Sequence, residues 1–169
     1  VDPVLKTVPK ERLKDAYSYS KALKQNSQFK STNSLQWQST VSNFGGRTRA
    51  IMWDPNDPLE RKVWAGGVTG GLWYKENITN TDAWVVLDDF WPSLAISCMT
   101  HDPNSPETFY VGTGEAQTAL IIYRESSGVG FGIMRSTDAG DNWEVMPGTE
   151  DFEYVTDIVV RDEGGSSII

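Results

Sequence analysis

Residues 50–58 read Ala-Ile-Met-Trp-Asp-Pro-Asn-Asp-Pro, and residues 98–106 repeat the pattern 48 residues later as Cys-Met-Thr-His-Asp-Pro-Asn-Ser-Pro. Each copy is followed by a short aromatic segment that ends in glycine, at residues 63–66 and 109–112. Self-similarity at a period of this length is typical of repeat architectures, in which each repeat is one small structural unit. The fold prediction therefore starts from this repeat.

Each repeat continues with a third apolar segment and with a fourth segment that opens on a tryptophan. The third segments are residues 71–74 and 132–135, and the fourth are residues 84–87 and 143–146. Short β-branched and aromatic segments separated by Asp-Pro, Pro-Asn and Gly-Gly favour antiparallel hairpins over helices. We predict an all-β fold, a partial β-propeller whose four-stranded antiparallel blades span residues 47–87 and 95–147.

The repeat extends beyond these two blades in both directions. A third unit starts at residues 155–162, and Trp37-Gln38-Ser39-Thr40 resembles a fourth strand placed upstream. Trp37 precedes Asp54 by 17 residues, close to the spacing in the later units. Propellers protect their sheet edges by letting a terminal strand complete the last blade. We expect residues 37–40 to be such a closing strand, and the remaining blades of this polypeptide, or another chain, to be partners.

The first 33 residues differ from this pattern and are expected to form an N-terminal helical arm and linker. Apolar residues fall roughly on one face between residues 9 and 26, after Pro9 as a first-turn residue. A polar stretch rich in Ser, Asn and Gln follows. The domain prediction is thus an arm at residues 1–33 and a partial propeller at residues 34–169.

Charge and composition exclude several classes of function. Residues 1–30 carry seven Lys/Arg against three Asp/Glu, whereas the remainder carries eight against twenty. Because phosphate binding requires clustered basic residues, the acidic body argues against a nucleic-acid partner. Cys98 and His101 are the only residues of their types, so no Cys/His zinc set exists, and burial is the expected role of Cys98. No apolar stretch approaches the ~20 residues of a membrane helix, so no transmembrane segment is predicted.

Residues 136–143 read Ser-Thr-Asp-Ala-Gly-Asp-Asn-Trp and fit the pattern S-x-D-x-G-x-x-W, with Asn142 where threonine is usual. This segment resembles the BNR/Asp-box repeat family, which includes sialidases, the luminal domain of sortilin and tandem-propeller xyloglucan hydrolases. Residues 43–49 resemble most closely the opening of secreted bacterial members. The resemblance implies a secreted or cell-surface protein, and some such members carry a C-terminal sorting domain for type IX secretion.

The predicted role of this motif is structural. Asp138 can accept backbone N–H bonds, Gly140 can take a left-handed conformation, and Trp143 can pack beneath the turn, with Ser136 opening it. The matching segment of the first blade, residues 75–84, keeps only its tryptophan.

Ligand sites of propellers usually gather at the loops near the axis, here residues 67–71 and 113–130. In the xyloglucan hydrolases the first of these loops resembles A-R-T-D-I-G-G, with a catalytic acid, whereas Val68 stands at that place here. Glycoside hydrolysis usually needs two carboxylates, so the change argues against this activity. Sialidases use arginine, acidic and tyrosine residues, and this chain lacks their F/Y-R-I-P signature.

The leading hypothesis is a non-catalytic scaffold or recognition module for protein or glycan, and the alternative is a glycoside hydrolase, xyloglucanase- or sialidase-like, with part of its catalytic residues in missing blades. For Arg47 and Arg49, ion pairing with neighbouring blades is an alternative to ligand binding, and for Glu115 the alternative is a hydrogen bond to its own loop. Tryptophans 37, 84 and 143 are expected to pack the blades, which leaves Trp53, Trp73 and Trp91 either for sugar stacking or for core packing between blades. No cofactor is expected, although the Asp-rich turns at residues 54–57 and 88–89 have the residue types for Ca²⁺. The candidate binding residues are Arg47, Arg49, Glu115, Tyr123, Arg124 and Trp73, of which Glu115 is also the candidate catalytic acid.

Overall fold

The computed structural model describes residues 4, 6, 11–25, 46–116 and 128–169. Its contacts divide the chain into two units, residues 1–45 and 46–169. The first unit contains helix α1 (Glu11–Gln25), which agrees with the helix expected between residues 9 and 26. Within the described residues, no helix combines the length and apolarity needed to cross a bilayer. The predicted closing strand at residues 37–40 lies outside the described residues.

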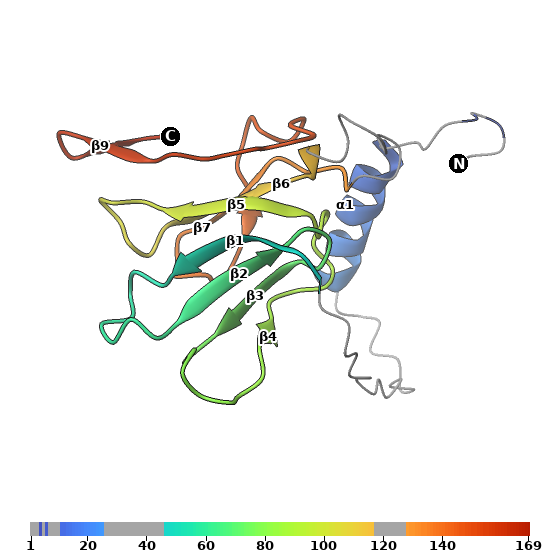
Figure 1. The fold of residues 1–169 in the computed structure, drawn as a ribbon. Helices are drawn as coiled ribbons and strands as arrows, with labels where there is room; N and C mark the ends of the chain where they lie inside the picture. The colour runs from blue at the N-terminus through green and yellow to red at the C-terminus, as the bar shows by residue number, and fades with distance from the viewer. Residues whose placement is uncertain (1–3, 5, 7–10, 26–45, 117–127) are drawn as a thin grey trace. The chain divides into compact units, whose positions relative to one another are not determined.

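The second unit is built from two four-stranded antiparallel sheets (Figure 1). The first sheet contains β1 (Thr48–Trp53), β2 (Val63–Gly67), β3 (Leu72–Lys75) and β4 (Val85–Val86), and the second contains β5 (Ile96–His101), β6 (Phe109–Thr113), β7 (Ile133–Ser136) and β8 (Glu144–Val145). In each sheet the strands lie side by side in chain order. The prediction of two four-stranded antiparallel units is confirmed, with fourth strands of only two residues each.

The repeat extends to the pairing of individual residues. Ile51 lies opposite Ala65, Ala65 opposite Trp73, and Trp73 opposite Val86. The second sheet has the same row, in which Met99, Val111, Met134 and Val145 succeed one another across its four strands. Each first strand also has a register shift near its start. Sequence repetition is therefore matched by repetition of the hydrogen-bond register.

The main core lies between the two sheets. Trp64 from the first sheet contacts Phe109 edge to face with ring centroids 5.8 Å apart, and the two side chains are 2% and 0% exposed. Leu72, Ile96, Val111 and Met134 are also buried here. Burying one such side chain contributes about 1.5–3 kcal/mol. A Cβ on Gly66 would lie 2.4 Å from Ile96 Cγ2, so glycine at the end of β2 allows the sheets to approach closely.

The other side of the second sheet is covered by the start of the third repeat. Cys98, Tyr110 and Ile133 form a buried cluster with Val155 and Ile158. The expected burial of Cys98 is confirmed. The second sheet therefore packs on both of its faces.

The third repeat departs from the strand expected at residues 155–162. Only β9 (Arg161–Glu163) is a strand, paired with β10 (Ser166–Ile168), and residues 155–160 are not a strand. Val155 is held here by its N–H, which donates to the Thr113 carbonyl at 3.0 Å, and by the burial of its side chain together with that of Ile158.

The turn at residues 136–143 is held by its own polar side chains. The Asn142 N–H donates to Asp138 Oδ1 at 2.8 Å, and the Gly140 N–H donates to Ser136 Oγ at 2.9 Å. Trp143 Nε1 donates to the Gly140 carbonyl at 2.8 Å. Gly140 has φ +95°, a left-handed conformation that glycine adopts without strain. Asn142, which replaces the usual threonine, adds a side-chain bond to Asp138 Oδ2 at 2.8 Å.

The same turn reaches the first sheet. A Cβ on Gly140 would lie 2.5 Å from Trp64 Cη2, so the indole ring packs directly against the glycine. The same indole donates from Nε1 to Asp54 Oδ2 at 3.0 Å. Trp64 is therefore held between the Asp-Pro-Asn turn of its own repeat and the Ser136–Trp143 turn of the next one.

We expect Gly140→Ala to lower the free energy of unfolding by about 2–4 kcal/mol, because it combines backbone strain with overpacking against Trp64. Gly148→Ala is the matched control, since Gly148 has φ +85° and nothing within 4 Å of a Cβ. The control should lose only about 1 kcal/mol. Equal losses in urea unfolding would show that the Gly140 contact contributes nothing beyond its backbone conformation.

Acid should weaken this turn. Hydrogen bonds from Asn142 and Ser136 hold the pKa of Asp138 below its ordinary value of 3.8. The folded state then binds this proton more weakly than the unfolded state, so the contribution is complete above pH 3.8 and is lost as the pH falls through the lowered pKa. We expect Asp138→Asn to flatten the fall in the free energy of unfolding between pH 5 and about pH 2, measured by denaturant titration, whereas Asp141→Asn in the same turn leaves it steep.

Candidate functional site

The loops that follow β2 and β6 lie at one end of the sheets, and the Asp-Pro-Asn turns lie at the other (Figure 1). This follows from the alternation of an antiparallel meander. The loop after β2 is closed by the Gly67 N–H donating to the Gly71 carbonyl, and Val68 donates to the Arg47 carbonyl, both at 2.9 Å. We call this end, where the predicted site residues were placed, the loop end.

Arg49 and Glu115 form an ion pair at the loop end. Arg49 Nη2 lies 3.1 Å and 3.3 Å from the two carboxylate oxygens of Glu115. The Glu115 side chain is 6% exposed and that of Arg49 is 31% exposed. The pair joins the start of β1 to the loop that follows β6, so it spans the two sheets. A charge-assisted bond at a partly buried position both orients Arg49 and neutralises the carboxylate.

The structure separates the predicted site residues. Arg49 and Glu115 come together, and the Glu115 N–H donates to the Gly128 carbonyl beyond the long loop. Trp73 Nε1 donates to the Gly70 carbonyl at 2.6 Å, which places its indole at the same end. Arg47 is exposed. Tyr123 and Arg124 lie outside the described residues.

Val68, which stands where the xyloglucan hydrolases would carry an acid, is 3% exposed. Its side chain belongs to the interior, and its backbone is tied to Arg47. The loop after β2 therefore offers an apolar, enclosed position where that chemistry would require a carboxylate open to substrate.

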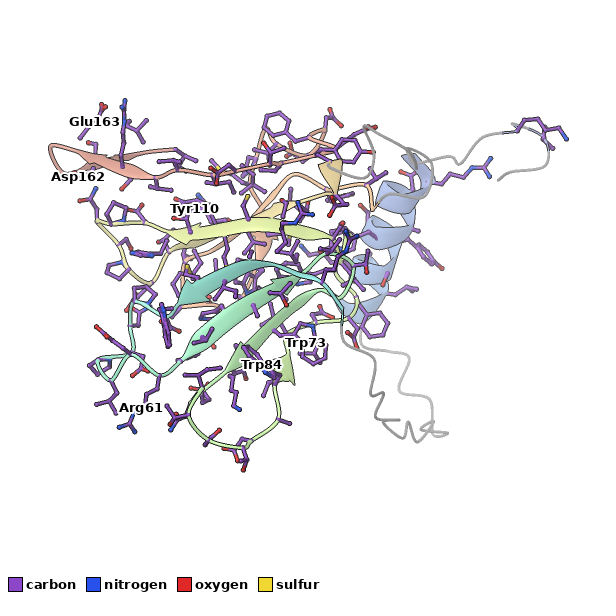
Figure 2. All side chains as sticks on the ribbon, viewed as in Figure 1. Arg61, Trp73, Trp84, Tyr110, Asp162 and Glu163 are labelled. Carbon is purple, nitrogen blue, oxygen red and sulfur yellow. The ribbon has the colours of Figure 1, made fainter. Side chains whose placement is uncertain are left out.

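The tryptophans do not all occupy the positions expected from the repeat. Trp143 packs in the core and contacts Trp91 with ring centroids 5.3 Å apart, so Trp91 is a packing residue. Trp84, also expected to pack, is 39% exposed, and Trp53 is 53% exposed. Trp73 and Trp84 lie beside the β3–β4 edge of the first sheet (Figure 2). Trp84 is exposed because the described residues do not cover its side of the first sheet as they cover that of Trp143.

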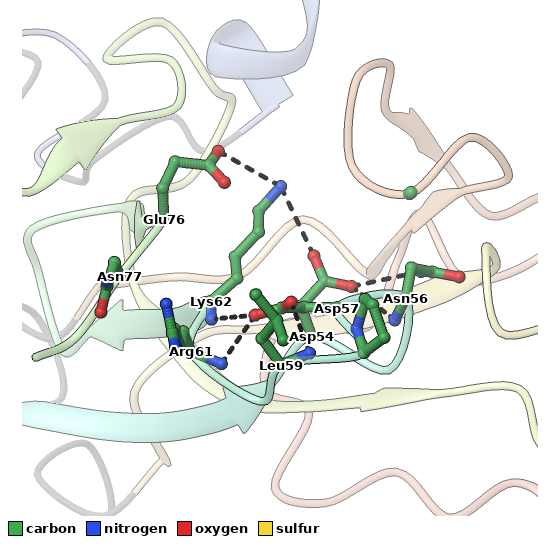
Figure 3. Close-up of a pocket in the computed structure, with 10 residues that line it drawn as sticks. Asp54, Asn56, Asp57, Leu59, Arg61, Lys62, Glu76 and Asn77 are labelled. Atoms are coloured by element: carbon green, nitrogen blue, oxygen red, sulfur yellow. Dashed lines mark hydrogen bonds and ion pairs between the residues drawn. The ribbon is translucent and has the colours of Figure 1, made fainter.

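A pocket of about 380 Å³ lies at the opposite end, between the Asp54 turn and Ala139 of the next repeat (Figure 3). Lys62 Nζ lies 3.5 Å from both Asp54 Oδ2 and Glu76 Oε1, and 5.2 Å from the ring centroids of Trp64 and Tyr74. Lys62, Asp54 and Glu76 are thus paired with one another in this pocket. The pocket lies away from Arg49 and Glu115. Sequence reasoning did not identify Lys62, because no motif separates it from other surface lysines.

The carboxylates of the Asp-rich turns accept backbone hydrogen bonds. Asp57 accepts from the N–H groups of Leu59, Arg61 and Lys62, which lowers its pKa. Asp88 likewise accepts from Phe90. Among the described residues, no three His, Cys, Asp or Glu side chains gather as metal ligands. The expectation that the chain needs no cofactor stays a prediction.

Comparison with known proteins gives one distant similarity. No protein-family model matches the chain. A curated xyloglucanase from Paenibacillus sp is 28% identical over 114 residues, which cover 64% of this chain and 10% of that protein. The matched region thus spans about a tenth of the length of the relative. This identity supports a loose relation to a protein of that name.

We expect Arg49→Met to cost about 1–3 kcal/mol of stability, because it leaves the Glu115 carboxylate buried without its guanidinium. Glu115→Gln should cost less, since the amide oxygen can still accept from Arg49. A double-mutant cycle by urea unfolding measures the pair, and a coupling energy of zero would mean that the contact does not stabilise the fold.

Proposed function

We propose that this chain is part of an exported or cell-surface Asp-box β-propeller that recognises a glycan or protein ligand without cleaving it. The two sheets are then consecutive blades, residues 155–169 start the next, and residues 37–40 supply the closing strand. The distant relative is named for an activity on xyloglucan, which makes a polysaccharide the first ligand to test.

The observation that carries the non-catalytic proposal is the ion pair between Arg49 and Glu115. A general acid or nucleophile must exchange a proton or a bond with substrate. The Glu115 carboxylate is instead almost fully buried and committed to a guanidinium on the neighbouring sheet. Val68 removes the other expected acid. Both features favour binding over hydrolysis at this end.

The ligand surface in this proposal is the loop end around Trp73, Arg47 and the 113–130 loop that carries Tyr123 and Arg124. An indole face covers the apolar face of a sugar ring, and Arg47 is exposed directly before β1. The alternative function is a glycoside hydrolase whose catalytic pair lies in other blades. The name of the relative favours this alternative.

A binding and turnover assay separates the two functions. On soluble xyloglucan, we expect Trp73→Ala to weaken retention in affinity electrophoresis by about 3–10-fold, the loss of one aromatic stacking contact. The matched control is Trp53→Ala. Trp53 is an exposed tryptophan at the end of β1 away from the loop end, and its variant should bind as the wild type does.

With aryl glycosides and xyloglucan as substrates, we expect no turnover by the chain. Turnover that Glu115→Gln abolishes while binding persists would overturn the non-catalytic proposal and establish Glu115 as a catalytic acid. Equal binding by both tryptophan variants would move the ligand surface away from Trp73.

A further inference from the structure

Strand β4 forms an open edge of the first sheet (Figure 1). In both sheets the fourth strand is outermost, so β4 and β8 each pair with a single neighbour among the described strands. An unpaired strand edge presents backbone N–H and C=O groups to which a further extended segment can bond. Each sheet thus has an edge at which strand addition is geometrically open.

The ladder between β3 and β4 shows which backbone groups point outward. The Leu87 N–H donates to the Leu72 carbonyl at 2.9 Å, so these two residues form a hydrogen-bonded pair. Because hydrogen-bonded and non-hydrogen-bonded pairs alternate along an antiparallel ladder, Val85 also bonds toward β3, whereas Trp84 and Val86 direct their N–H and C=O groups away from it. The edge therefore offers two donors and two acceptors at alternate residues.

The repeat supplies a matched comparison, because a charge protects the equivalent edge of the second sheet. Glu144 on β8 stands at the place of Val85 and forms an ion pair with Arg135 on β7. Its side chain is 59% exposed. Charged side chains on an edge strand are a common means of preventing a further strand from pairing. Val85 is 43% exposed and apolar, so the β4 edge lacks this protection.

The charges around β4 indicate which peptide fits this edge. Residues 83–87 read Ala-Trp-Val-Val-Leu and carry no charge, whereas Asp82 precedes them and Asp88 follows them. An extended peptide that pairs antiparallel with residues 82–88 sets its two ends opposite these aspartates. Opposite charges directly across a strand pair are stabilising. The matching peptide therefore has β-forming residues at its centre and a basic residue at each end.

The same aspartates argue against a second copy of this chain as the occupant. Antiparallel pairing of β4 with β4 about Val85 would set Asp82 of one copy opposite Asp88 of the other, at both ends of the pair. Like charges directly opposite each other are destabilising. The edge is thus better suited to a different polypeptide.

We propose that the β4 edge docks an extended segment of another protein, which has β-branched residues at its centre and a basic residue at each end, and which pairs antiparallel with residues 83–87. Trp84 and Val86 supply the backbone hydrogen bonds, and Asp82 and Asp88 select the basic ends. Neighbouring strands lie about 4.8 Å apart, so the peptide is two strand spacings from β3 and leaves Trp73 exposed. The proposal goes beyond ligand recognition at the loop end and does not depend on it.

A synthetic heptapeptide tests the proposal. Its sequence is Lys-Thr-Val-Val-Val-Thr-Lys, with a fluorophore at the amino end and an amide at the carboxyl end, and its binding to the 169-residue chain is measured by fluorescence anisotropy. We expect saturable binding that weakens about 10-fold when both lysines of the peptide are replaced by glutamate.

Backbone methylation of the peptide tests the ladder itself. In the proposed register the third and fifth peptide residues lie opposite Val86 and Trp84, so N-methylation of these two amides removes the donors that face β4. We expect this peptide to lose detectable binding. N-methylation of the second and fourth amides, which face away from β4, is the matched control and should leave the affinity unchanged.

A proline substitution tests the same ladder from the side of the protein. Val86→Pro removes an outward N–H, and an edge strand tolerates proline where the N–H faces solvent. We expect it to weaken peptide binding about 10-fold. Val145→Pro at the equivalent position of β8 is the matched control and should bind as the wild type does. If Val86→Pro fails to fold, as judged by urea unfolding, the N-methylated peptides decide the question without any substitution.

The absence of saturable binding would overturn the proposal, and so would equal binding by the two N-methylated peptides or by the two folded proline variants. Tighter binding of the glutamate peptide would also overturn it, because the aspartates would then not select basic ends. Trp73→Ala should bind the heptapeptide as the wild type does. Failure of xyloglucan recognition at the loop end and failure of peptide docking at β4 are therefore distinguishable.

Discussion

The packing of Trp64 against Gly140 is the contact on which the described sheets depend. The ring is 2% exposed and lies too close to the glycine for any side chain there. Its indole N–H is satisfied by Asp54, so the polar atom carries no burial penalty. Because the glycine belongs to one repeat and the ring to another, the conformation of this turn determines how closely the two sheets approach.

Much of this arrangement can be predicted from the sequence, because it depends on local patterns that recur along the chain. The strand positions follow from the repeated Asp-Pro-Asn phrase, and the turn at Ser136 follows from residue types that bond within a few positions of one another. The pair of Arg49 and Glu115 spans 66 positions and belongs to no repeated pattern. The sequence suggested ion pairing for Arg49 and a functional site for Glu115, but it gave no reason to pair these two residues with each other.

Two failures of the sequence reading have a common physical cause. Residues 155–160 have strand-forming composition but are not a strand, and Trp84 has a packing position but is exposed. Neither strand pairing nor burial is a property of a segment alone, since both require a partner surface. The repeat predicts which residues each unit presents for pairing or burial, and the neighbouring unit determines whether they become paired or buried.

The charged groups follow the same logic and narrow where function can reside. At the end of the sheets where the Asp-Pro-Asn turns lie, Lys62 pairs with both Asp54 and Glu76, and Asp57 accepts three backbone N–H bonds, so these side chains hold the turns. Asn56 and Asn104 are committed to the next repeat. The loop end differs, because Arg47 is exposed there and Trp73 is fixed by its own indole bond. An end whose polar groups are used for assembly has little left for a ligand, so the loop end, where an exposed cation and a fixed aromatic ring remain, is the better candidate for the recognition that we propose.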